Sequence, residues 1–213
     1  MRRRLPGLLV NAALLVLTAA LFPRLAEQVP THWNMHGEVD GTMPRFPGAF
    51  LAPVIGIALC ILLPLLRRID PRSRSYDRFD GTFNIVVNAV ALLMSAVQIM
   101  TLAVALGYEL DVTRWMMVGS GVLFVVLGNY MPRIRSNWWM GIRTPWTLES
   151  EEVWRRTHRF GGRAFVAGGV ITVAASLMLG GAGAYISLAA MMAAGLAPVV
   201  YSYVVWRGVR RDA

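Results

Sequence analysis

The sequence predicts an all-α polytopic membrane protein with about six transmembrane helices and with both termini in the cytoplasm. Of its 213 residues, 56% are hydrophobic and only 15% are charged, whereas a soluble domain is about 45–50% apolar and about one quarter charged. The mean hydropathy is +0.51. The apolar residues fall in blocks long enough to cross a hydrocarbon layer of about 30 Å. We therefore expect residues 1–213 to form a single helical membrane domain.

Six apolar blocks have the length of a membrane span. They cover approximately residues 5–22, 49–66, 82–107, 115–131, 164–180 and 184–206. The first block follows three arginines, an arrangement that also describes a secretory signal peptide. Cleavage of this block would leave an odd number of spans and would place the other arginine-rich loops on the wrong side, so we interpret it as the first span.

The distribution of arginine predicts the orientation. All 21 basic residues are arginine, and cytoplasmic loops of membrane proteins carry the excess of basic residues. With the N-terminus inside, 18 arginines lie on the cytoplasmic side, and only Arg24, Arg45 and Arg114 lie outside. The net charge of +9 therefore indicates membrane topology, and we predict no direct nucleic-acid partner. The predicted location is the inner membrane of the cell.

Three patterns indicate how the helices pack. In the fifth block, small residues recur every four positions, which allows a second helix to approach closely: Ala164, Gly168, Thr172, Ser176 and Gly180. In the last block, Ala189, Ala193 and Ala197 repeat this spacing, so we expect a tight helical hairpin across a turn at residues 181–183. In the third block, Asn84, Asn88, Ser95 and Gln98 share one face, which predicts interhelical hydrogen bonds or, alternatively, a polar cavity.

The extracellular loop, residues 23–48, is longer than a connection requires. Its glycines and prolines predict an ordered set of turns. Trp33 is expected at the membrane interface, where tryptophans are common. His32, Asn34 and Asp40 are expected to tie the turns together or to face a ligand, and with Trp33 they form our candidate ligand-binding residues.

The same loop permits a metal-site hypothesis, which we consider the weaker one. His32 and His36 are four residues apart and Glu38 and Asp40 follow, so two imidazoles would converge on one face of a helix. Gly37 and the neighbouring prolines disfavour that helix. The single cysteine, Cys60, lies inside an apolar block and offers no thiol-based site. We therefore predict no metal and no cofactor.

The cytoplasmic loop, residues 132–163, contains two features. Ser150 followed by Glu151 and Glu152 predicts the start of a short helix, on which Trp154 and His158 share one face. That face, with arginines beside it, suits the lipid headgroup layer. The preceding run, GIRTPWTL, is a stiff turn that membrane anchoring would not require. Our candidate partner-binding residues are Arg143, Thr144, Pro145, Trp146, Trp154 and His158.

These two loops carry a family resemblance. The run GNYMPRIRSNWWMGIRTPWTLESEEVWRRTHRFGGR, residues 128–163, resembles the signature of the SdpI family of bacterial multi-pass membrane proteins. The outer run PTHWNMHGEVDG resembles the domain of unknown function that precedes this signature in longer members. The matching inner positions are Asn129, Pro132, Asn137, Trp138, Gly141, Arg143, Thr144, Pro145, Trp146, Thr147, Trp154, His158, Gly161 and Gly162, and the outer ones are His32, Trp33, Gly37 and Asp40.

The resemblance implies immunity to a secreted peptide toxin, and in the founding member also signalling through recruitment of a cytoplasmic transcriptional repressor. Two other functions remain open. A small-molecule or lipid transporter or flippase would use the polar face of the third block, although no ionisable residue lies near the middle of a span. A lipid-acting enzyme would use Arg143, Arg155, Arg156 and His158, but no nucleophile is identifiable, so we predict no catalytic residue and no enzymatic activity.

Overall fold

The computed structural model describes residues 5–211, and it confirms the all-α fold with six helices long and apolar enough to span a membrane. These helices are α1 (Leu5–Leu21), α2 (Arg45–Ile69), α3 (Asp80–Ala105), α4 (Val112–Tyr130), α6 (Glu151–Met178) and α7 (Gly180–Arg211). The connections contain short helices η2 (Phe22–Arg24), η3 (Ser73–Arg78), η4 (Met131–Arg133) and α5 (Pro145–Glu149), and two strands, β1 (Gln28–Trp33) and β2 (Val39–Pro44).

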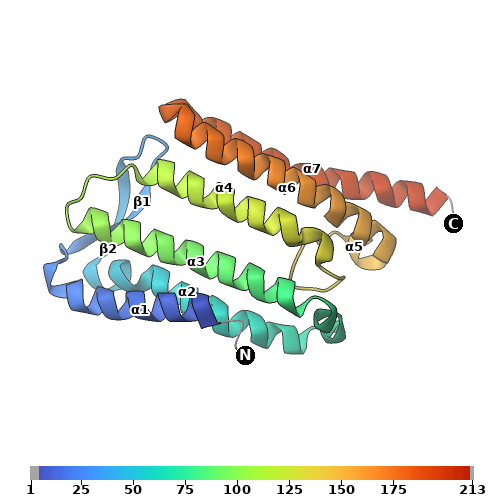
Figure 1. Ribbon diagram of the computed structural model, residues 1–213, viewed down its shortest axis with the longest axis horizontal. Helices are drawn as coiled ribbons and strands as arrows, with labels where there is room; N and C mark the ends of the chain where they lie inside the picture. The colour runs from blue at the N-terminus through green and yellow to red at the C-terminus, as the bar shows by residue number, and fades with distance from the viewer. Residues whose placement is uncertain (1–4, 212–213) are drawn as a thin grey trace.

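The six long helices lie roughly antiparallel in two groups of three (Figure 1). Helices α1, α2 and α3 form one group, helices α4, α6 and α7 form the other, and α3 lies beside α4 between them. The antiparallel strands β1 and β2 pair at one end of the bundle, which we call the hairpin end. Helix α1 begins and helix α7 finishes at the opposite end, where α5 also lies, and we call this the signature end.

Several element boundaries differ from those predicted. The helix that begins after Ser150 does not stop before the fifth span but is continuous with it as α6. The break before α7 lies at Leu179 and Gly180, directly before the turn predicted at residues 181–183. Gly180 takes the left-handed φ of 53°. The outer loop is shorter than predicted, because α2 already begins at Arg45. Its ordered part is a β-hairpin.

Buried amides hold the first three helices together. The side-chain nitrogen of Gln98 on α3 donates to the hydroxyl of Thr18 on α1 and to the carbonyl oxygen of Ala49 on α2, at 2.8 and 2.9 Å. Asn11 on α1 donates to the carbonyl oxygen of Ala91 on α3 at 2.9 Å. The polar face predicted for the third span thus points into the bundle, where interhelical hydrogen bonds satisfy polar groups that lipid cannot.

Glycine pairs bring the backbones of α4 and α6 into contact. A Cβ on Gly128 would lie 2.6 Å from the carbonyl oxygen of Gly162, and one on Gly162 would lie 2.7 Å from that of Gly128. One heptad away, Gly121 and Gly169 face each other at 2.9 and 2.5 Å in the same sense. Larger side chains would separate these helices, so the glycines set their distance.

The contact between α6 and α7 also uses small residues, but not all of those predicted. A Cβ on Gly168 would lie 2.6 Å from the Cβ of Ala194, and the hydroxyls of Ser176 and Ser187 are 2.9 Å apart. The predicted ridge on the last span is wrong, because its three alanines are exposed: Ala189, Ala193 and Ala197. Gly180 also belongs to the turn and not to the contact, since nothing lies within 4 Å of a Cβ built there.

We expect Gly168→Leu to destabilise the protein by about 2–3 kcal/mol, because overpacking a tight contact has roughly this cost. The control is Gly195→Leu on α7, where no atom lies within 4 Å of the added Cβ and leucine favours the helix. Thermal unfolding in detergent measures both variants. Equal melting temperatures for the two would show that Gly168 does not set the α6–α7 distance.

The orientation of the termini in the membrane remains a prediction, and the distribution of arginines between the two ends of the bundle supports it. Fifteen of the arginines within residues 5–211 lie at the signature end, and Arg24, Arg45 and Arg114 lie at the hairpin end. The positive-inside rule therefore places the signature end in the cytoplasm. We expect a fluorescent protein fused after Ala213 to fluoresce and an alkaline phosphatase fused there to be inactive. The reverse pattern would invert the orientation.

Candidate functional site

The hairpin at one end of the bundle is anchored at its base. Val29 on β1 is fully buried and packs with Leu25, Ala49 and Leu102. A Cβ on Gly48 would lie 2.9 Å from the Cβ of Val29, so α2 starts directly against the strand. Because its base belongs to the core of α2 and α3, the hairpin holds a fixed position above the bundle.

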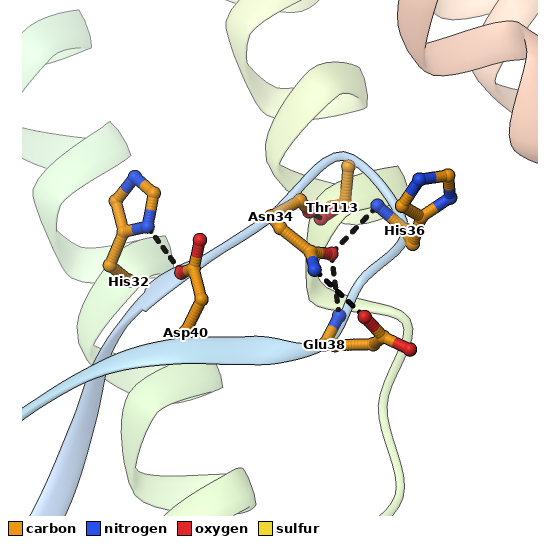
Figure 2. Close-up of polar contacts among 6 residues, drawn as sticks. All are labelled: His32, Asn34, His36, Glu38, Asp40 and Thr113. Carbon is orange, nitrogen blue, oxygen red and sulfur yellow. Dashed lines mark hydrogen bonds and ion pairs between the residues drawn. The ribbon is translucent and has the colours of Figure 1, made fainter.

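The tip of the hairpin is organised by Asn34 (Figure 2). Its side-chain oxygen accepts hydrogen bonds from the backbone N–H groups of His36 and Glu38, and its side-chain nitrogen donates to the Glu38 carboxylate at 2.8 Å. Gly37 completes the turn with a left-handed φ of 85°. The hydroxyl of Thr113 donates to the carbonyl oxygen of Asn34 at 2.8 Å. The tip is therefore fastened to the first turn of α4.

His32 and Asp40 face each other across the two strands. The Nδ1 atom of His32 lies 2.5 Å from a carboxylate oxygen of Asp40, and the two side chains are 72% and 42% exposed. Trp33 beside them is half-buried. The pair links the strands. It also presents an imidazole and a carboxylate to solvent, where the hydrogen-bonding groups of a ligand can reach them.

His36 lies apart from this pair. Its ring packs edge-on against Tyr185 of α7 at 6.5 Å, and it borders a cleft of about 180 Å³ between the hairpin tip, the start of α4 and the α6–α7 turn. Within residues 5–211, no three His, Cys, Asp or Glu side chains gather closely enough to hold a metal ion. The metal-site hypothesis therefore has no geometric support.

At the opposite end, Asn137 is the centre of what we call the signature loop, residues 134–150. Its fully buried side-chain oxygen accepts from the N–H groups of Trp139 and Met140 and from the hydroxyl of Tyr76, at 2.9, 2.7 and 3.1 Å. Its side-chain nitrogen donates to the carbonyl oxygens of Arg135 and Met140. One amide thus fixes both sides of a tight bend.

The loop between α2 and α3 supports this bend from behind. Buried Asp70 accepts from the hydroxyl of Tyr76 at 2.7 Å and from the N–H of Trp138 at 2.9 Å. Burial and this carboxylate raise the pKa of Tyr76, so its hydroxyl keeps its proton. Arg72 donates to the hydroxyl of Ser136 and to the carbonyl oxygen of Leu148. Sequence reasoning missed all three of these residues, because no local motif connects them to a loop more than 60 positions away.

Trp154 and His158 lie inside the protein and not at a lipid-facing surface. Their rings stack at 4.0 Å and they are 3% and 1% exposed. The Nδ1 atom of His158 lies 2.9 Å from the Trp154 carbonyl oxygen, while Nε2 accepts the N–H of Ile142 at 3.1 Å. Trp154 in turn donates to the carbonyl oxygen of Ile134 at 2.8 Å. The headgroup-layer interpretation of Trp154 is therefore wrong, and both side chains hold the signature loop against α6.

The run GIRTPWTL forms helix α5 and its entry. Thr144 and Thr147 make reciprocal hydrogen bonds in a capping box, which starts a helix by satisfying its first N–H groups. The indole of Trp146 donates to the hydroxyl of Ser202 on α7 at 2.6 Å. Pro145 is exposed at the first helical position. The hydroxyl of Thr144 also lies 3.5 Å from that of Ser202, so Thr144 and Trp146 both attach this turn to the last helix.

The surface of the signature loop is formed by different residues. Trp138 and Trp139 are 46% and 41% exposed. Arg143 is also exposed, and its guanidinium donates to the carbonyl oxygen of Trp138 at 2.5 Å. Together these three residues form a basic and aromatic surface on a rigid support.

Comparisons with known proteins match two separate segments of the chain, one that contains the hairpin and one that contains the signature loop. Residues 133–202 match the family model described as the SdpI/YfhL protein family, and residues 9–57 match a domain of unknown function, DUF1648. The chain is 25% identical over 181 residues to a protein named Immunity protein SdpI from Bacillus subtilis (strain 168), with 84% of each chain covered. No solved structure matches the chain. The part of this multi-pass membrane protein that contains the signature loop and most of its last two long helices is therefore similar to the SdpI/YfhL protein family.

Proposed function

We propose that this protein is a membrane immunity protein that recognises a secreted peptide toxin at its hairpin end and signals to a cytoplasmic partner through its signature loop. The observation that carries the proposal is the similarity to the Bacillus immunity protein, which extends over 84% of both chains. Both matched segments contain a preorganised polar structure, one at each end of the bundle. The protein would act in the bacterial inner membrane.

At the hairpin end, recognition would fall to the exposed His32 and Asp40 pair and the neighbouring Trp33. These side chains lie on strands held at the base by Val29 and at the tip by Asn34. A ligand that binds a fixed surface loses little free energy in ordering it. Asn34 would contribute by positioning the hairpin and not by contacting the toxin.

Helix α4 is the element that connects the two ends. Thr113 in its first turn binds the hairpin tip, and its last turn leads through η4 into the signature loop. Between them, the glycine contacts with α6 join the backbones closely. A toxin that binds two positions of α4 with different affinity would shift the signature loop between two states, and the free energy of signalling would come from that difference.

At the signature end, a partner would contact Arg143, Pro145 and the exposed tryptophans. Buried Thr144, Trp154 and His158 would act through the shape of the loop, as would Trp146 through Ser202. A cytoplasmic repressor with an acidic and aromatic surface would fit the exposed residues, because arginine pairs with carboxylates and packs on rings.

The alternative of a transporter or flippase receives less support from the structure. It relied on the polar face of α3, and Gln98 and Ser95 on that face already donate hydrogen bonds to protein oxygens. The alternative of a lipid-acting enzyme relied on His158 as a base. That side chain is 1% exposed and accepts a backbone hydrogen bond, which leaves it no access to substrate.

The test is survival of a Bacillus subtilis strain that lacks its own immunity protein, challenged with spent medium of strain 168. We expect expression of this chain to restore survival, and the double variant His32→Ala, Asp40→Ala to lose most of that effect at equal membrane abundance. Thr42→Ala is the matched control, because it removes another exposed contact between the strands, to Gln28. Equal survival with the double variant and the control would separate the hairpin from toxin recognition.

We expect Arg143→Lys to impair protection or partner recruitment several-fold, because lysine keeps the charge but loses the planar fork of donors. Arg155→Lys is the control, since Arg155 is exposed and pairs with Glu152 on the same helix, a contact that lysine can retain. Both variants are compared at matched membrane abundance in the survival assay. If they behave alike, Arg143 contributes only charge.

A further inference from the structure

The face of α3 between α1 and α4 carries two neighbouring grooves. One lies between α1 and α3, has a volume of about 590 Å³ and reaches from Gly81 to Leu92. The other lies between α3 and α4, has a volume of about 310 Å³ and reaches to Ala96. They share Ala89 and Leu92. Leu92 is 42% exposed and forms a ridge that separates the two grooves.

At the signature end, the start of α3 and the end of α4 border a third, polar cleft. This cleft of about 650 Å³ shares Gly81 and Ile85 with the first groove and contains three arginines: Arg78, Arg133 and Arg135. Arg133 is held in place by the ring of Tyr130, 5.0 Å from its Cζ atom. Along α3, polar surface therefore gives way to apolar surface within one helical turn.

The charge of this cleft is positive. Asp77 and Asp80 also line it, but both carboxylates bind the guanidinium of Arg67, at 2.7 and 2.5 Å. Among residues 5–211, no carboxylate forms an ion pair with any of the three arginines. Their guanidinium groups can thus bind an external anion by donating hydrogen bonds to it, and the arrangement of these donors matches phosphate particularly well.

We propose that this face binds one anionic phospholipid, with its phosphate at Arg78, Arg133 and Arg135 and one acyl chain in each groove. The dimensions agree with this assignment. From Ile85 to Ala96 the helix rises about 16 Å, which is roughly the depth of one leaflet in a hydrocarbon layer of about 30 Å. A helix from a second copy, about 10 Å wide, would instead need one broad groove without the Leu92 ridge.

The headgroup is tested by native mass spectrometry of the full chain released from detergent with equal amounts of phosphatidylglycerol and phosphatidylcholine of the same acyl chains. We expect one retained phosphatidylglycerol for the wild type. The double variant Arg133→Gln, Arg135→Gln should lower its retention about tenfold or more, because each basic residue near an anionic headgroup contributes roughly fivefold. The control is Arg207→Gln with Arg211→Gln, which removes the same charge from exposed positions on α7.

The acyl chains are tested with Ala89→Leu, which narrows both grooves and leaves the arginines unchanged. We expect it to reduce lipid retention several-fold, while Ala167→Leu on the exposed face of α6 does not, and water-soluble glycerol phosphate should not displace the lipid. Equal retention of the two lipids by the wild type, or equal effects of the two arginine pairs, would overturn the proposal. A protein dimer that disappears in Ala89→Leu would instead assign the grooves to a second copy and overturn it as well.

Discussion

Gly141→Ala is expected to abolish protection and to unfold the signature loop locally. Gly141 has a φ of 104°, which a residue with a Cβ rarely adopts, and the new Cβ would lie 2.3 Å from Nε2 of His158. The clash would also break the hydrogen bond from the N–H of Ile142. Backbone strain, overpacking and a lost buried hydrogen bond together amount to about 4 kcal/mol.

Limited trypsin digestion of the purified protein reads out this change, because Arg135 and Arg143 flank the bend. The control is Gly107→Ala, which has a comparable φ of 90° but no atom within 4 Å of the added Cβ. This control introduces similar backbone strain without any clash with a neighbouring side chain. If Gly141→Ala is digested no faster than Gly107→Ala, the contact between His158 and the loop does not hold the loop in shape.

Asn137→Ala is expected to have the second largest effect. The substitution removes five hydrogen bonds and leaves the N–H groups of Trp139 and Met140 without this acceptor, while the hydroxyl of Tyr76 keeps its hydrogen bond to Asp70. Each polar group left unsatisfied inside the protein costs about 1–3 kcal/mol, so we expect the two N–H groups to lower stability by at least about 2 kcal/mol and protection to fall strongly.

The matched control for that substitution is Asn129→Ala on α4. Asn129 also matches the family signature but is exposed, so its truncation should change thermal stability by less than about 0.5 kcal/mol. Unfolding in detergent, followed by the fluorescence of the loop tryptophans, compares the two. Similar melting temperatures would mean that the amide of Asn137 is replaceable, for example by water.

The sequence predicts the membrane spans well because their cause is local. Twenty apolar residues in succession are sufficient for a span, and all six long helices overlap the expected blocks. Boundaries near the membrane surface are harder, because polar residues can continue a helix beyond the hydrocarbon layer. Thus α6 starts at Glu151, 13 residues before the predicted span.

The arrangement of the candidate sites depends on contacts that no local pattern encodes. Helical periodicity placed Trp154 and His158 on one face, but it could not tell whether lipid or protein covers that face. Only the position of the signature loop decides this, and that position depends on Asp70 and Tyr76 from another loop. On the last span, the four-residue spacing of alanines occurs on a face that does not meet α6, since composition alone does not reveal helix rotation.

Recognition of a toxin by the hairpin and the response of the signature loop can be measured together by hydrogen exchange of the full chain in lipid nanodiscs. Exchange is compared with and without the toxic peptide fraction of strain 168 spent medium. We expect slower exchange in β1 and β2 together with altered exchange at residues 137–150 in the same sample. Exchange that is unchanged in the hairpin, at peptide concentrations that kill the sensitive strain, would contradict this expectation.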